Sequence, residues 1–100
     1  MSVSFSVYLP SDGRLWPADP VDAPNFLASN AARLGDVLGL IEFCHDGRMD
    51  SGGQCPVAVF RERLARFPDG HPDPDVHQRL AQLMRLVGGD VPEDALVSWG

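Results

Sequence analysis

The sequence SVSFSVYL, residues 2–9, alternates between apolar and polar side chains along its whole length. Its odd-numbered positions hold Val, Phe, Val and Leu, and its even-numbered positions hold Ser, Ser, Ser and Tyr. A period of two over eight residues predicts a β-strand that buries one face and leaves the other exposed. The sequence PSDG at 10–13 predicts a turn after this strand. Leu15 and Trp16 are consistent with a short second strand, and the proline-rich stretch 17–24 predicts a loop.

Three segments further along the chain carry apolar residues at helical spacing. They are residues 25–40, 55–67 and 73–89. Apolar residues that recur every three or four positions form one stripe along a helix, and such a stripe is expected to pack on the core. The three stripes are Leu27, Ala31, Leu34, Leu38 and Ile41; Val57, Phe60, Leu64 and Phe67; and Val76, Leu80, Leu83 and Val87.

The predicted helices begin and end at residues with suitable backbone or capping chemistry. Asn25 and Ser29 are both credible N-caps of the first helix. Gly39 suits a left-handed position at the end of that helix. Pro56 suits the first position of the second helix. One of the two aspartates in the sequence DPD, residues 73–75, is expected to cap the third helix.

The sequence ALVSW, residues 95–99, predicts a short strand at the end of the chain. Because the two clearest strand signals lie at the chain ends and the helices lie between them, the simplest closure pairs these strands with each other. We therefore expect a single α+β domain over residues 1–100. Three amphipathic helices would pack on a small antiparallel sheet built from residues 2–9 and 95–99.

The composition is that of an acidic globular protein, with 44% hydrophobic residues, 22% charged residues and a formal net charge of −6. All eight basic residues are arginine. The absence of lysine excludes a phosphate-binding lysine and Schiff-base chemistry. The excess of acidic residues argues against nucleic acid as a partner, because phosphate contacts require clustered positive charge.

The chain has no apolar run approaching the roughly 20 residues that a membrane-spanning helix requires. The sequence MSVSFSVYLP, residues 1–10, lacks the basic region and the long apolar core of a signal peptide. We therefore expect no membrane association and a cytoplasmic location, where both cysteines would be reduced.

Cys55 is the strongest single candidate for chemistry. It follows a glycine pair at 52–53 and precedes Pro56. A cysteine that caps a helix is exposed to the helix dipole and to free N–H groups, which stabilise a thiolate. Nothing in the sequence places a histidine beside it, so a small half-buried residue ahead of a helix is the simpler interpretation. A thiol-dependent enzyme or redox sensor using Cys55 is the alternative function.

Five residues have side chains that could bind a metal: Cys44, His45, Cys55, His71 and His77. Structural zinc sites usually draw on closely spaced pairs of such residues. The two cysteines are separated by ten residues, and the last two histidines are separated by five with a predicted helix start between them. We therefore assign no metal site and no cofactor.

The leading hypothesis for function is a non-catalytic module that binds another protein, in the manner of an accessory or inhibitor protein. Aromatic and arginine side chains are enriched at protein–protein interfaces. On this basis the candidate partner surface consists of Tyr8, Trp16, Arg61, Arg66 and Trp99. Arg61 and Arg66 lie off the apolar stripe of the second predicted helix and are expected to face water. The alternative for the two tryptophans is that they cap the ends of the sheet core. The sequence leaves open whether the partner is a second copy of the chain, that is, whether the protein is a homodimer.

Two helical segments and the C-terminus share a pattern of capping and packing residues, in the sequences NFLASNAARLGDVLGL, CPVAVFRERLARF and VSWG. This pattern resembles a group of small bacterial proteins with an N-terminal strand, an asparagine-rich helix start ending in Leu-Gly-Leu, and no established activity. The resemblance covers residues 20–67 and the tail. It implies the same element order and supplies no catalytic residues. It rests on Asn25, Asn30, Arg33, Leu34, Leu38, Gly39, Leu40, Phe60, Arg63 and Leu64.

Overall fold

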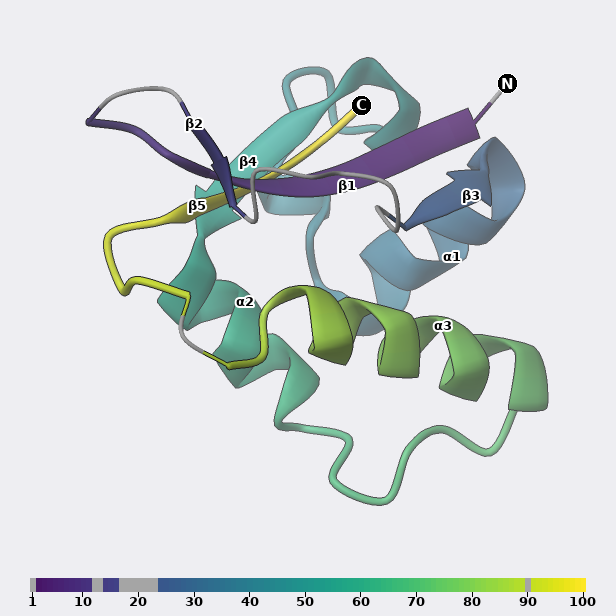
Figure 1. Ribbon diagram of the computed structural model, residues 1–100. Coiled ribbons are helices and arrows are strands. Elements are labelled where there is room, and N and C mark those ends of the chain that lie inside the picture. Colours follow the sequence, from purple (N-terminus) through teal and green to yellow (C-terminus); the bar gives the residue numbers. More distant parts are fainter. Residues whose placement is uncertain (1, 12–13, 17–23, 90) are drawn as a thin grey trace.

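The computed structural model of the chain describes residues 2–11, 14–16, 24–89 and 91–100. The chain forms short strands, three α-helices and two 3₁₀ turns over these residues (Figure 1). In chain order the elements are β1 (Ser2–Leu9), β2 (Arg14–Trp16), β3 (Asn25–Leu27), α1 (Ala28–Leu38), η1 (Ile41–Phe43), η2 (Met49–Ser51), β4 (Gly53–Pro56), α2 (Val57–Leu64), α3 (Pro74–Leu86) and β5 (Leu96–Trp99).

The strands form an antiparallel sheet in the order β2-β1-β5-β4, and β3 pairs separately with the first half of β1. The two ends of the chain lie side by side in the middle of the sheet, in a register that runs from Phe5 opposite Trp99 to Tyr8 opposite Leu96. The predicted α+β fold and the predicted pairing of the chain ends are therefore confirmed. The short second strand at Leu15 and Trp16 is also present, as part of β2.

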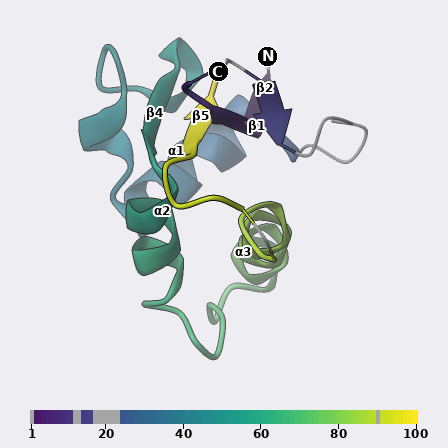
Figure 2. The ribbon, with the colours of Figure 1, turned by 60° about the vertical axis from the view of Figure 1, so that its left-hand side comes forward.

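One face of the sheet, which we call the inner face, packs on the helices. In both views α2 and α3 lie below the sheet (Figures 1 and 2), and the buried residues of α1 join the same core. Val3, Phe5 and Val7 are buried on this face. The ring of Phe5 is central, because its centroid lies 5.8 Å from that of Phe26 and 5.9 Å from that of Trp99.

The end of α1 has the backbone geometry that the sequence predicts. Gly39 adopts a φ angle of 66°, and the N–H of Leu40 donates to the carbonyl of Gly35 at 2.8 Å. This bond satisfies one of the carbonyl groups that a helix end would otherwise leave free. The start of α3 also follows the prediction, since the Asp73 side chain accepts a hydrogen bond from the N–H of Asp75 at 2.9 Å.

The start of α1 differs from the prediction. Asn25 belongs to β3, Ser29 lies inside the helix, and the residue at the cap position is Leu27, which forms no side-chain cap bond. The reason is tertiary: Phe26 pairs with Val3 of β1 and is buried in the core. This pairing requires residues 25–27 to be extended, so the helix begins only at Ala28.

A second strand absent from the sequence-based prediction is β4. Residues 53–56 pair with β5, with Gly53 opposite Trp99 and Cys55 opposite Val97. The strand requires glycine at its start, because a Cβ atom on Gly53 would lie 2.5 Å from the carbonyl oxygen of Phe43 and 2.9 Å from the Trp99 ring. The strand forms by pairing with β5. Its first residue is glycine because the neighbouring Trp99 ring occupies the space that a side chain would fill.

Candidate functional site

The face of the sheet opposite the helices is formed by small and uncharged side chains. The alternation of the strands places on it every residue that does not point into the core. We call this set the outer sheet face; it consists of Ser2, Ser4, Ser6, Tyr8, Asn25, Leu27, Gln54, Pro56, Leu96 and Ser98. These residues are exposed or half-buried, whereas their immediate neighbours along each strand are buried, except near the end of β1, where Leu9 is half-buried.

The described residues of the outer sheet face include no Asp, Glu, Arg, Lys or His. Strands β1, β3, β4 and β5 hold no Asp, Glu, Arg or His, although 22% of the chain is charged. A solvent-facing sheet surface ordinarily carries charged residues, which oppose unwanted association. Depletion of charged residues together with an exposed tyrosine is instead typical of surfaces that bind proteins, and serine and asparagine supply adaptable hydrogen bonds in antibody binding loops.

Tyr8 and Gln54 are joined across the outer sheet face. The Tyr8 hydroxyl donates to Gln54 Oε1 at 2.5 Å. Tyr8 belongs to β1 and Gln54 to β4, and β5 lies between these two strands. The tyrosine side chain therefore crosses over β5, where it presents part of its ring to solvent in a fixed position. A fixed aromatic ring loses little conformational freedom when a partner packs on it.

Leu27 extends the outer sheet face at the β3 end. Leu27 is 64% exposed, more than any other large hydrophobic residue whose side chain the structure describes. Register places it opposite Ser2 on β1. Leu96 lies half-buried at the other end of the face, opposite Tyr8. The face is therefore polar in its centre and carries an aliphatic side chain towards each end.

Of the residues predicted to form a partner surface, Tyr8 lies on the outer sheet face and Trp99 does not. The Trp99 side chain is buried on the inner face, beside Phe5 and over Gly53. Its Nε1–H has no acceptor among the residues that the structure describes. Trp99 lies opposite Phe5, so it points to the inner face and belongs to the sheet core, and it is not available to the predicted partner surface. Trp16 belongs to β2, and its side chain lies outside what the structure describes.

Arg61 is also placed differently from the prediction, which left it facing water. Its Nε donates to the carbonyl of Val87 at 2.8 Å and its Nη2 to the carbonyl of Val91 at 3.3 Å. The guanidinium therefore binds the chain where α3 ends, and it is half-buried. Arg66 is exposed, as predicted, but it follows α2 and does not adjoin Tyr8 in the sheet. The predicted set of five residues is thus not brought together.

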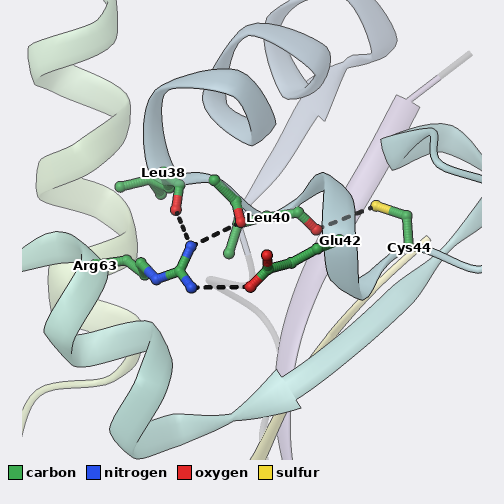
Figure 3. A network of polar contacts seen from close by, with 6 residues as sticks. Leu38, Leu40, Glu42, Cys44 and Arg63 are labelled. Atoms are coloured by element: carbon green, nitrogen blue, oxygen red, sulfur yellow. Dashed lines mark hydrogen bonds and ion pairs between the residues drawn. The ribbon is translucent and has the colours of Figure 1, made fainter.

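Arg63, which the sequence analysis did not select as a site residue, plays the same part at the end of α1 (Figure 3). Its Nη1 donates to the carbonyls of Leu38 and Gly39, at 3.2 and 2.8 Å, and its Nη2 to Glu42 Oε1 at 2.9 Å. Since α1 has no basic residue in its last turn, Arg63 supplies the positive charge that a helix C-terminus favours. Because the guanidinium donates to three acceptors within the chain, Arg63 has a structural role.

Cys55 lies in β4 and does not cap α2, whose N-cap is Pro56. The helix start that the alternative requires is therefore absent at Cys55, because β4 continues through this residue, which pairs with Val97. The simpler interpretation, a small residue packed ahead of the helix, fits the structure. The thiol is buried, and burial raises its pKa from 9.0 to about 12, against a smaller opposing effect of the Arg63 charge. At neutral pH the side chain is a protonated thiol that fills part of the inner face.

The other cysteine, Cys44, is half-buried beside η2. Its Sγ lies 3.5 Å from the carbonyl oxygen of Leu40 and 3.5 Å from Met49 Sδ (Figure 3 shows the first contact). Met49 packs in turn on Gly35 of α1, where a Cβ atom would lie 2.7 Å from Met49 Cγ. This close approach explains a glycine in the middle of a helix, and the sulfur contacts belong to core packing.

A shallow groove lies between the end of α2 and the last turns of α3. It has a volume of about 430 Å³ and is lined mainly by Leu64, Phe67, Met84 and Val87. Met84 is 37% exposed at its edge. The groove is open and apolar, and Arg61, its charged lining residue, is already bonded to Val87 and Val91. It therefore offers no free polar group that would select a ligand.

Groups of three or more His, Cys, Asp or Glu side chains that could hold a metal ion do not occur within the described ranges. The helices in these ranges also do not combine the length and the apolar character needed to cross a membrane. No protein-family model, curated protein or solved structure matches the chain.

Proposed function

We propose that the protein is a non-catalytic module that binds another protein chain, and that the outer sheet face is its contact surface. The observation that carries the proposal is the absence of charged side chains from the described residues of a face that the helices leave uncovered. Moving a charged side chain out of water into an interface is costly unless it is paired. A neutral face avoids that cost, and its hydroxyl and amide groups can bond to many partners.

The rigidity of the face also favours this function. Each residue of the face belongs to a strand, and the central strands β1 and β5 have hydrogen-bonded neighbours on both sides. Beneath them the Phe5 ring packs on aromatic rings from three other elements. A surface on such a support loses little entropy when a partner binds.

The alternative function, thiol chemistry at Cys55, receives little support from the geometry. A nucleophilic cysteine requires a thiolate fraction and access for the substrate. The buried position and the raised pKa of Cys55 oppose both requirements.

Photo-crosslinking in the producing cells tests the proposal. A photo-reactive phenylalanine derivative in place of Ser4 would report contacts at the outer sheet face, and the same derivative in place of the exposed Ser29 of α1 is the matched control. We expect a covalent adduct from position 4, none from position 29, and loss of the position-4 adduct when Ser98→Arg places a charge on the same face. Equal adducts from both positions, or none, would contradict the proposal.

A further inference from the structure

We propose that the partner of the outer sheet face is a second copy of this chain, which packs its own outer sheet face against the first to form a two-fold symmetric dimer. This inference rests on the proposed function, because it names the occupant of the same surface.

The first argument is the distribution of charge. Each chain carries a formal net charge of −6, so two copies repel each other over most relative orientations. Every described Asp and Glu lies outside the sheet, in helices, turns or loops, for example Asp36 in α1 and Asp75 in α3. A contact through the outer sheet face places these carboxylates at the periphery, where water and salt screen them.

The second argument is self-complementarity. A two-fold axis brings the same patch of both copies together, so a residue on the axis meets its own equivalent. A charged residue in that position would face a like charge. The polar side chains of the outer sheet face are hydroxyls and amides, each of which both donates and accepts hydrogen bonds. Such groups can bond to their own symmetry mates, which makes the face compatible with itself.

The third argument concerns size and predicts a weak dimer. The strands of the outer sheet face, β1, β5, β4 and β3, contain 8, 4, 4 and 3 residues. At about 3.4 Å per residue and about 4.8 Å between strands, they give a face of about 300 Å². A standard interface buries about 800 Å² on each partner. A dimer through this face alone should therefore dissociate in the micromolar range or above, so that monomer and dimer coexist at concentrations that are easy to study.

Sedimentation velocity over a concentration series from about 1 µM to 1 mM tests the inference. We expect a reversible monomer–dimer equilibrium for the natural chain, tightened by moderate salt because salt screens the repulsion between two acidic chains. Ser6→Arg and Ser6→Glu should both weaken the dimer at least tenfold, because Ser6 lies at the centre of the sheet, opposite Ser98 of β5. Ser29→Arg and Ser29→Glu, which change the net charge equally on α1, should leave it unchanged.

Because the sample contains only this chain, a reversible dimer identifies the partner as a second copy. Weakening of that dimer by either sign of charge places the contact on the outer sheet face, because an unpaired charge is costly to bury there. Thermal unfolding verifies that each Ser6 variant folds, and Ser98→Arg with Ser98→Glu provides a second pair on the same face. A natural chain that stays monomeric at every concentration would overturn the inference, as would a dimer that the Ser6 and Ser98 pairs leave intact.

The mass of the photo-crosslinked adduct separates this inference from the proposed function. An adduct at position 4 with twice the mass of the chain supports a second copy. An adduct of another mass would overturn the second copy and leave the proposed function standing. The absence of any adduct at position 4 would overturn both.

Discussion

The inner and outer faces of the same sheet differ completely in how their residues are used. Phe5 on the inner face is fully buried and contacts three aromatic rings, whereas Ser6, its neighbour in sequence, is half-exposed on the outer face. The alternation of a strand thus places a residue that holds the fold together next to one that contributes little to it. Stability and surface chemistry can therefore be changed independently on these strands.

The largest difference between the faces is expected for Phe5→Ala against Ser6→Ala. Removing the Phe5 ring leaves a cavity among Phe26, Phe60 and Trp99, and such a change typically lowers the free energy of unfolding by about 3–5 kcal/mol. Ser6→Ala should change it by less than about 0.5 kcal/mol. Denaturant unfolding measures both values. Similar losses for the two variants would mean that the faces do not differ as described.

A second comparison uses adjacent residues of β4. Gly53→Ala adds a Cβ atom against the Phe43 carbonyl and the Trp99 ring, and overpacking of this kind costs about 1–3 kcal/mol. Gln54→Ala alters only the outer sheet face and removes the acceptor of the Tyr8 hydroxyl, so we expect a loss of less than about 1 kcal/mol. Midpoints of urea unfolding would give both. If the Gly53→Ala variant were as stable as the natural chain, the result would show that the Trp99 ring can move away from the added methyl group.

Cys55 makes the inner face sensitive to alkaline pH. Its pKa is about 12 in the folded chain and about 9 in the unfolded chain, so between these values the folded state retains a proton that the unfolded state has lost. Stability should therefore fall as pH rises through this interval, by at most about 1.4 kcal/mol per pH unit, and remain unaffected by this group below pH 9.

The chain is well suited to that measurement, because it contains no lysine. Urea unfolding at a series of pH values should show that the natural chain loses stability at alkaline pH. The stability of Cys55→Ala should depend less on pH over the same interval. Rapid modification of Cys55 by iodoacetamide at pH 7, before unfolding, would contradict the buried and protonated state.

The smallest effect is expected on the outer sheet face itself. Tyr8→Phe removes the hydroxyl that donates to Gln54 but keeps the ring, so stability should fall by about 0.5 kcal/mol or less, because both groups are accessible to water. The ring would lose its fixed position over β5. Thermal unfolding gives the change, and a loss above about 1.5 kcal/mol would indicate that this bond supports the fold.

Periodicity predicts β1 and most of the buried residues in the helical stripes, and the order of the elements predicts the pairing of β1 with β5. Leu27 is wrongly placed in the first buried stripe: it belongs to β3 and is 64% exposed, because its pairing with β1 directs it to the outer sheet face. The strands β3 and β4 were not predicted. Each is short, and each is extended because a neighbour pairs with it: β1 in the case of Phe26, and β5 in the case of Cys55. Pairing over long sequence separations leaves little trace in a segment of three or four residues.

The candidate site was predictable only in part. The even-numbered serines and Tyr8 of β1 were visible as an exposed face, and Tyr8 was selected. The remaining residues of the outer sheet face come from strands whose register depends on the whole fold, which is why Gln54 and Leu27 were not selected. Trp99 and Arg61 were selected for their chemical type, but their surroundings bury one and bond the other to backbone carbonyls.

The two arginines of α2 have a consequence for how the domain opens. Arg63 donates hydrogen bonds to carbonyl groups at the end of α1, and Arg61, two residues earlier, donates to carbonyl groups at the end of α3. An isolated eight-residue helix is only marginally stable. In this fold, however, α2 supplies the side-chain hydrogen bonds to the ends of both longer helices. Unfolding of α2 should therefore release the C-terminal ends of α1 and α3 together, and amide hydrogen exchange should show α2 and these two helix ends opening as a single unit.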